Sequence, residues 1–599
     1  METKRAPYGA LLFILAVIQD GLMTLNPASI QDWLRRDAAV ILAYLLATVV
    51  VTYPLVLNLG GSSMPIGGDA FMKLWDVWWL ERMVATGQPF HYSRDLFYPV
   101  GLDLSFHPAS WTTTAVIWLL GQFMGVFSAY KVMILVGVFS SAYAAYLLAF
   151  WLTKNRVAAW FGGAIFSFAP YHIGDLRGHP DLAQLAFIPL AVLCVLIGLR
   201  HRRIGMAALA GVLLGLVAWT GLYLFGFAAI TLAMLLAYEG LLERGWREKY
   251  FWRFLGLFVL AASVFVAPRL LPIFDDRASL SFVIENKFTA YESQVDLLSY
   301  FVPPPANPLL TPLLGELSDK IAQSVSVYSS PYLGWVALIA SLSAVLFAKD
   351  RKTIWLWAVI AALFLTLSLG PALRFAGRVY MQVPLPAWLL MRRFEIFRSV
   401  HPILFHIGVL LPLSVLASFG LSGWLEGLQG KPQIRAGVVL LLALALFVEY
   451  WNGEFWVAPL EAPAIYRDIA NDPDEFAVID LPMGYSPSKY YLFLQTVHGK
   501  PIVEGMTSRM PPNAFDYIDS NLLLSLWRAE ESLDCTDFKM ASITGAIDML
   551  SADGFKYVFV HEPDMYADYF QGVPVTAADG SVTMYALTDL RDFFPCANR

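Results

Sequence analysis

The chain has 599 residues, of which 58% are hydrophobic and only 15% are charged. An ordinary soluble domain has about 25% charged residues and a smaller apolar share. The composition therefore predicts an integral membrane protein. The formal net charge of −6 combines acidic residues near the C-terminus with short basic connectors between apolar stretches. This pattern gives no basis for a nucleic-acid partner.

Residues 1–37 form an N-terminal segment. Within it, Lys4 and Arg5 precede an apolar stretch over residues 8–25. No small-residue cleavage pattern follows, which favours an extra or interfacial helix over a cleaved signal peptide.

Residues 38–452 contain repeated apolar stretches that approach the roughly 20 residues a helix needs to cross a bilayer. They predict a polytopic α-helical membrane domain with about eleven transmembrane helices, and one more if residues 8–25 also cross. The predicted helices lie at residues 38–58, 131–152, 157–171, 182–199, 205–221, 222–242, 251–273, 331–348, 353–371, 401–422 and 436–452.

Several connectors between these stretches are rich in Lys and Arg, which places short loops on the cytoplasmic side. The basic connectors are residues 153–156, 200–203, 243–253 and 349–352. The segments then expected outside a cell (plasma) membrane are residues 60–130, 172–181, 274–330, 372–400 and the chain after residue 453. Residues 111–130 are also apolar enough to cross, but a crossing there would invert every later loop. We interpret them as a membrane-surface or half-inserted helix.

Residues 453–599 have a different sequence pattern from the membrane domain, because short β-rich stretches alternate with helical ones. The predicted elements are strands at 476–481, 501–504, 557–561 and 582–587 and a helix over 488–497. They indicate a small extracytoplasmic α/β domain. Its Cys535 and Cys596 could form a disulfide there, a pairing that their spacing alone leaves open.

The first outer loop opens with PIGGDAFMKLWDVWWL at residues 65–80. Two glycines allow turns closed to other residues just before Asp69. Helical spacing then places Asp69, Lys73 and Asp76 on one face, and three tryptophans, which favour the membrane interface, cover the rest. Two interpretations stay open. The segment is either an interfacial helix whose charges meet water and headgroups, or part of a half-dry cleft in which Asp69 acts as a general base.

The second outer loop, YHIGDLRGHPD at residues 171–181, lies between two apolar helices. Its Arg177 offers a planar fork for phosphate and its His179 a switchable donor, which favours phosphate contact beside Asp175. A metal site is a weaker interpretation because the histidines lack helical spacing. An ordinary connector is the third interpretation.

Several arginines are predicted near the outer ends of later helices, where the positive-inside tendency normally depletes them. Arg269 and Arg398 are examples. They indicate either an anion such as a lipid phosphate or side chains that snorkel to headgroups. The loop over residues 274–330 is long enough to fold over a cleft as a lid, or to lie on lipid.

These features, taken together, resemble the GT-C superfamily of polyprenyl-phosphate-dependent glycosyltransferases. A single helix is followed by a long outer loop that opens with GGDAF, then by further helices and another long outer loop. The stretches GDAFMKLWDVWWL, FSFAPYHIGDLRGHPDLAQLAFIPL, LLSYFVPPPANPL and FRSVHPILF are similar to a bacterial group related to the YfhO-like and mannosyltransferase-like membrane proteins. The resemblance covers about residues 38–505.

The resemblance implies a donor sugar carried on a polyprenyl phosphate and an acceptor that enters from the outer side. It implies that Asp69 is the base that activates the acceptor. Some members place two adjacent acids in this loop, often with a divalent cation, Mg²⁺ or Mn²⁺. Here the second acid is Asp76, several residues later, which favours a metal-independent mechanism, with a divalent cation, Mg²⁺ or Mn²⁺, as the alternative. We single out no metal ligand.

The resemblance also implies lipid-phosphate contacts in the second loop, by Asp175, Arg177 and His179. Lys73, Arg269 and Arg398 are further candidates.

The leading hypothesis is a membrane glycosyltransferase that moves the sugar to an extracytoplasmic glycan, lipid or protein acceptor. The alternative is a non-catalytic membrane scaffold or assembly subunit of an envelope complex, working through its exterior C-terminal domain. A transporter is disfavoured because the sequence has no second half that repeats the first. Membrane lipids are expected to surround the helices.

Overall fold

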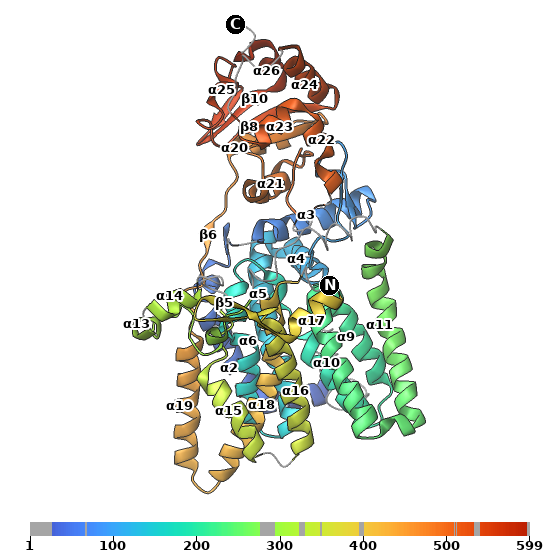
Figure 1. The fold of residues 1–599 in the computed structure, drawn as a ribbon, viewed down its shortest axis with the longest axis vertical. Helices are drawn as coiled ribbons and strands as arrows, with labels where there is room; N and C mark the ends of the chain where they lie inside the picture. Colours follow the sequence, from blue (N-terminus) through green and yellow to red (C-terminus); the bar gives the residue numbers. More distant parts are fainter. Residues whose placement is uncertain are drawn as a thin grey trace. The chain divides into compact units, whose positions relative to one another are not determined.

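The computed structural model describes residues 27–65, 67, 69–275, 294–314, 316–322, 330–347, 350–394, 400–507, 510, 512–531 and 540–595. The predicted helix over residues 8–25, the loop glycine at 68, Arg398 and both C-terminal cysteines lie outside these ranges. The chain divides into two compact units, whose elements are drawn in Figure 1. The helical unit comprises Met1–Leu59, Tyr130–Leu270 and Lys287–Trp456, and the mixed unit comprises Gly60–Ala129, Leu271–Asn286 and Val457–Arg599.

Each of the eleven predicted apolar stretches corresponds to a helix. These helices are α2 (Pro27–Val51), α5 (Val126–Thr153), α6 (Arg156–Phe168), α8 (Phe187–Arg200), α9 (Gly205–Thr220), α10 (Leu222–Ala237), α11 (Lys249–Asp275), α15 (Trp335–Phe347), α16 (Arg351–Ser368), α18 (His406–Gly427) and α19 (Pro432–Tyr450).

Seven described helices are long and apolar enough to cross a membrane, so the protein is a multi-pass membrane protein. They are Val126–Thr153, Pro180–Arg200, Leu222–Leu242, Lys249–Phe274, Arg351–Ser368, Pro402–Gly427 and Pro432–Tyr450. Two shorter apolar helices, Gly205–Thr220 and Trp335–Phe347, accompany them. The total of about eleven spans stays a prediction.

Helix α18 lies at the centre of the helical unit, and most of its residues are buried. Small residues let its neighbours approach closely. A Cβ added at Gly420 would lie 1.9 Å from the carbonyl oxygen of Ala340 in α15, and one added at Gly162 in α6 would lie 2.2 Å from Ser418 Oγ. Close backbone contact through small residues is the usual way that helices pack in membranes, because lipid gives no hydrophobic force between them.

Helix α4 (Trp111–Met124) occupies the segment whose crossing the sequence left in doubt. Its 14 residues extend about 21 Å, which is shorter than the roughly 30 Å of a bilayer core. The helix stops at Gly125, whose φ of +78° favours glycine, and α5 begins at the next residue. Whether α4 lies on the membrane surface or is half-inserted stays a prediction.

The mixed unit is built around a four-stranded sheet with the order β7-β8-β10-β9. Strands β7 (Ala477–Leu481) and β8 (Phe555–Val560) are parallel, and β10 (Val582–Ala586) is antiparallel to both β8 and β9 (Ala577–Asp579). The three longer strands coincide with predicted strands. The predicted segment 501–504 contributes only an isolated bridge, between Ile502 and Val478.

The helices of the mixed unit come from both parts of the sequence. Those after the membrane helices are α20 (Ala464–Ala470), α21 (Tyr485–His498), α22 (Asp516–Ser520), α23 (Leu522–Arg528), α24 (Met540–Ala552), α25 (Ala567–Phe570) and α26 (Leu587–Phe593). Helix α3 (Ala70–Thr86) comes from the first outer loop and packs against α21. The sequence assigns this loop to the membrane domain, and in the division into compact units its residues 60–129 group with residues 457–599.

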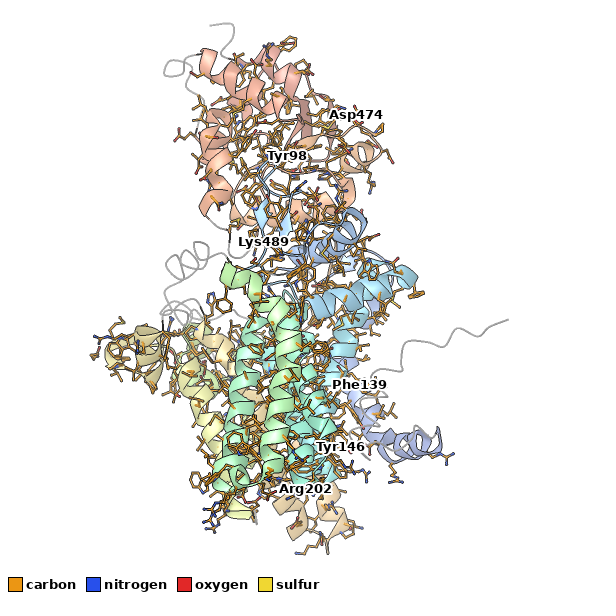
Figure 2. The ribbon with its side chains drawn as sticks, turned by 90° about the vertical axis from the view of Figure 1, so that its right-hand side faces the viewer. Tyr98, Phe139, Tyr146, Arg202, Asp474 and Lys489 are labelled. Atoms are coloured by element: carbon orange, nitrogen blue, oxygen red, sulfur yellow. The ribbon has the colours of Figure 1, made fainter. Side chains whose placement is uncertain are left out.

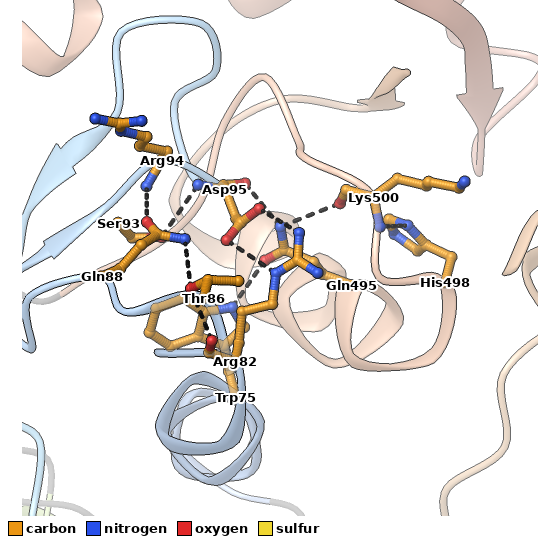
Figure 3. A network of polar contacts seen from close by, with 10 residues as sticks. All are labelled: Trp75, Arg82, Thr86, Gln88, Ser93, Arg94, Asp95, Gln495, His498 and Lys500. Atoms are coloured by element: carbon orange, nitrogen blue, oxygen red, sulfur yellow. Dashed lines mark hydrogen bonds and ion pairs between the residues drawn. The ribbon is translucent and has the colours of Figure 1, made fainter. Parts of the chain in front are cut away.

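A buried polar network joins α3 to α21 (Figure 3). The Trp75 indole donates to Gln495 Oε1 at 2.7 Å, and Gln495 Nε2 donates to the carbonyls of Asp95 (2.7 Å) and Lys500 (3.2 Å). Trp75 stacks on Trp79, and neither side chain is exposed. The expectation that these two tryptophans face the membrane interface is therefore wrong, because they fill the core of the mixed unit.

We expect Gln495→Ala to lower the free energy of unfolding by about 1–3 kcal/mol, because the Trp75 indole would lose its buried acceptor. Thermal melting of the detergent-purified full-length protein measures the change. Gln88→Ala is the control, because the hydrogen bonds of Gln88 are exposed to solvent. Equal melting temperatures for the two variants would contradict a stabilising role for the network.

Candidate functional site

Asp69 immediately precedes α3 and pairs with a lysine from the C-terminal part of the chain. Lys489 Nζ of α21 lies 3.0 Å from Asp69 Oδ1, and the two side chains are 18% and 15% exposed. Figure 2 labels Lys489 on this helix. A cation at this distance stabilises the ionised form of the carboxylate. Sequence reasoning missed Lys489, which is 420 residues away and resembles any lysine on a polar helix face.

Lys73 and Asp76 are buried rather than exposed beside Asp69. Asp76 Oδ1 lies 2.6 Å from Nε2 of His107, and Asp76 Oδ2 lies 3.7 Å from Lys73 Nζ. Lys73 also donates to the carbonyl of Pro108. All three ionisable side chains are almost completely excluded from solvent. Buried charges of this kind require partners, so this cluster holds α3 against the loop that follows it.

The second outer loop belongs to the helical unit and forms α7 (Pro170–Asp175) and a short 3₁₀ turn at Pro180–Ala183. Asp175 and His179 are partly exposed, whereas Arg177 is buried. Arg177 Nη2 donates to the carbonyls of Asn452 (3.0 Å) and Glu454 (2.8 Å). Arg177 therefore anchors this loop to the segment that follows α19.

Two further buried side chains shape this loop. Both ring nitrogens of His172 face carbonyls, those of Ser167 at 2.6 Å and Leu182 at 2.7 Å. Burial lowers the pKa of His172, although the two carbonyls favour its charged form. Asp181 Oδ2 accepts a hydrogen bond from Tyr223 at 3.0 Å. The loop motif contains Asp181 but predicts no role for it, because its partner Tyr223 lies 42 residues away in the sequence.

The outer arginines differ in their surroundings. Arg269 lies in α11 and is buried. Arg374 lies in β4 (Ala372–Phe375), which forms a hairpin with β5 (Arg378–Pro384). Burial lowers the pKa of Arg374, and the nearby Asp296 opposes this shift. Asp296 is itself buried and accepts from the backbone N–H of Gly377 at 2.6 Å, so this acid stabilises the hairpin.

The described residues around Asp69 provide no set of ligands for a divalent cation. Within the described ranges, no group of three or more His, Cys, Asp or Glu side chains has the arrangement of a metal site. The position beside Asp69 Oδ1 is taken by the Lys489 ammonium, and Asp76 is enclosed with its own partners. We assign no step to a metal ion.

Comparison with known proteins supplies a family and a fold. The family model described as a domain of unknown function (DUF6311) matches residues 35–452. No curated protein matches the chain.

Two solved structures have a similar fold. The arabinofuranosyltransferase AftD from Mycobacteria has a TM-score of 0.59 at 15% identity, with 92% of this chain and 40% of that chain covered. The oligosaccharyltransferase AglB from Archaeoglobus fulgidus, in complex with an inhibitory peptide and a dolichol-phosphate, has a TM-score of 0.51 at 12% identity, with 90% and 71% covered. The chain thus spans less than half the length of AftD. The chain shares the fold of these two proteins, in agreement with the resemblance to the GT-C superfamily seen in the sequence.

We expect Arg177→Ala to lower the free energy of unfolding by at least about 1.5–3 kcal/mol, because its charged hydrogen bonds to two carbonyls are lost. Thermal melting of the full-length protein measures the loss. Arg392→Ala serves as the control, since Arg392 is an exposed arginine at the end of α17 (Pro386–Arg393). An unchanged melting temperature for Arg177→Ala would show that Arg177 is not a structural anchor.

Proposed function

We propose that this chain, which belongs to the DUF6311 family, is a membrane glycosyltransferase that takes its sugar from a polyprenyl-phosphate donor. The acceptor is an extracytoplasmic glycan, lipid or protein. The GT-C fold supports this proposal, because two proteins that share it are named as transferases of arabinofuranosyl or oligosaccharide groups. The AglB complex with a dolichol-phosphate supports a lipid-linked donor.

The observation that carries the proposal is the placement of Asp69. This carboxylate stands at the start of α3, remains partly accessible, and pairs with Lys489. Lys73 and Asp76, the other charges in the motif, are enclosed in the core. Of the two acids in the motif, Asp69 is therefore the one that a substrate hydroxyl can reach.

In the proposed reaction, Asp69 accepts the proton of an acceptor hydroxyl or amide while the acceptor atom attacks the anomeric carbon of the donor sugar. The new glycosidic bond forms as the bond from the anomeric carbon to the phosphate oxygen breaks, and the configuration inverts. Polyprenyl phosphate leaves with the bonding electron pair. Cationic side chains aimed at that phosphate would stabilise its developing charge.

The side chains proposed to contact the phosphate differ in their present hydrogen bonds and in their exposure to solvent. Arg177 Nη2 donates to two carbonyls, and we propose that the same side chain also contacts the phosphate. Asp175 and His179 line the same loop and are partly exposed. Arg269 and Arg398 stay candidates from the sequence, together with the more enclosed Lys73.

The proposed orientation places Asp69 outside the cytoplasm. Ion pairs join the basic connectors at one end of the helical unit. Arg200 contacts Glu239 at 3.0 Å, and Lys352 contacts Glu243 at 2.9 Å. Figure 2 shows Arg202 of the same connectors beyond Tyr146 at that end of the unit. Clustered basic connectors favour the cytoplasmic side.

We expect Asp69→Asn to lower sugar transfer by about 10²- to 10⁴-fold, the usual contribution of a positioned general base. The assay follows radiolabel from polyprenyl-phosphate-linked sugars into membrane glycan, using vesicles that contain the full-length protein. Asp103→Asn is the matched control, because Asp103 is a partly exposed acid in the same loop whose side chain accepts only from the Ser105 N–H among the contacts described. Normal transfer by Asp69→Asn would refute the base assignment.

A second variant, Lys489→Met, distinguishes a catalytic role of Asp69 from a purely structural one. A structural ion pair predicts that Asp69→Asn and Lys489→Met lower the melting temperature and the activity in parallel. A catalytic Asp69 predicts that Asp69→Asn loses activity at an unchanged melting temperature. If both variants transfer sugar normally but removal of residues 453–599 abolishes the cellular phenotype, a non-catalytic scaffold is the better description.

A further inference from the structure

Two titratable side chains leave the sheet of the mixed unit at the same edge. Asp480 is close to the carboxyl end of β7, and His561 directly follows β8. Because these strands are parallel neighbours, their carboxyl ends meet at one edge. In open α/β sheets, ligands bind beyond the carboxyl ends of parallel strands. This edge is therefore a natural place for a binding site.

Tyr466 of α20 completes the cluster and fixes the position of its protons. The Tyr466 side chain is buried, and its hydroxyl donates to Asp480 Oδ1. The Tyr466 oxygen is also 2.8 Å from His561 Nε2, which lies 3.1 Å from Asp480 Oδ1. A tyrosine has one hydroxyl proton, so Nε2 must carry the ring proton in order to donate to both oxygens. In the neutral imidazole, Nδ1 is then an acceptor.

One acceptor atom of the cluster is buried without a partner. Asp480 is 4% exposed, and its Oδ2 has no hydrogen-bond partner within the part of the chain that the structure describes. The His561 side chain is 13% exposed, which leaves a path from solvent to the cluster. A buried acceptor without a partner costs free energy. A ligand that donates to Oδ2 would remove that cost, and Nδ1 of the neutral His561 ring would accept a second donor.

Aromatic rings extend the cluster towards Asp69. The Tyr490 ring of α21 is 6.2 Å from the His561 ring, and Phe71 at the start of α3 packs edge-on against Tyr490 at 5.6 Å. Tyr490 directly follows Lys489, the partner of Asp69. Tyr490 therefore contacts His561 of the cluster and also Phe71, which follows Asp69 by two residues.

We propose that Asp480, His561 and Tyr490 form a subsite that binds a saccharide of the acceptor through its hydroxyl groups. The acceptor atoms Oδ2 and Nδ1 receive two hydroxyl protons, and the Tyr490 ring packs on the apolar face of the sugar. The choice of a saccharide rests on the proposed function, whereas the buried Oδ2 of Asp480, which has no partner among the described residues, does not. Aromatic surfaces with a few well-placed polar groups are typical of small-ligand sites.

The same chemistry argues against other ligands. A phosphate or carboxylate would bring further acceptors and negative charge to Asp480. A metal ion lacks ligands, because within the described segments no third His, Cys, Asp or Glu joins Asp480 and His561 in a metal-like group. A neutral ligand with several hydroxyl donors satisfies both acceptors without a new charge.

The test replaces Tyr490 with the photo-crosslinker p-benzoylphenylalanine in the full-length protein within its native membrane. After irradiation, the protein is purified under denaturing conditions and its covalent adducts are analysed for sugars by mass spectrometry. We expect sugar-containing adducts from this position. Phe593, an exposed aromatic residue of α26 in the same unit, provides the matched control position.

Second-site variants test the hydrogen bonds. Within the Tyr490 crosslinker protein, we expect His561→Leu to lower the adduct about tenfold, the effect of one lost hydrogen bond of about 1.4 kcal/mol. We expect His561→Asn to retain part of the adduct, because its amide oxygen can replace Nδ1 as an acceptor. Equal adducts from Tyr490 and Phe593, adducts with protein only, or no effect of His561→Leu would each overturn the proposal.

Asp69→Asn separates this inference from the proposed reaction. In that background we expect the sugar adduct to persist, because binding at the cluster does not need the base. Loss of transfer without any adduct in the parent protein would refute the subsite and leave the reaction standing. A normal adduct with normal transfer by Asp69→Asn would refute the reaction and leave the subsite standing.

Discussion

The mixed unit depends on the burial of polar groups along α3. Trp75 and Asp76 are completely enclosed, and each brings at least one polar atom out of water. A buried donor or charge without a partner costs more than most single contacts return. Gln495 and His107 supply the partners. This requirement fixes α3 against α21, and the position of Asp69 follows because it immediately precedes α3.

The apolar helices were predictable because their signal is local. A stretch of apolar residues long enough to approach a bilayer thickness forms a helix whatever surrounds it, since backbone groups in lipid must bond within their own segment. All eleven stretches are helices, and β7, β8 and β10 lie where alternation of apolar residues indicated them. The apolar pattern does not show which helices contact each other. The close approach of Gly420 to Ala340, for example, depends on how α18 and α15 pack in three dimensions.

The partners in the site were not predictable for the same reason. Asp69 could be singled out because glycines and a helix start surround it. Lys489 carried no comparable signal, since a lysine in a mixed helix is usually solvated. The tryptophans of α3 misled because a ring that faces lipid headgroups and a ring that fills a protein core have the same spacing. Trp75 and Trp79 differ from interfacial residues only through α21, which begins more than 400 residues later.

Helix α21 carries Lys489 and Tyr490, the two residues on which the function of the mixed unit would depend, and buried hydrogen bonds hold the helix near both of its ends. Near its C-terminal end, Gln495 bonds to α3 and to the loop at Asp95. At its start, the buried Glu504 accepts from the Gly484 N–H at 2.7 Å and from Ser488 Oγ at 2.8 Å. Burial raises the pKa of Glu504, and these two donors oppose that shift by favouring its ionised form. Lys489 and Tyr490 lie between these two anchors, so neither can move without breaking buried hydrogen bonds. A base held by Lys489 and a saccharide packed on Tyr490 would then both be positioned by consecutive residues of α21. Preorganisation of this kind lowers the barrier to a transfer reaction.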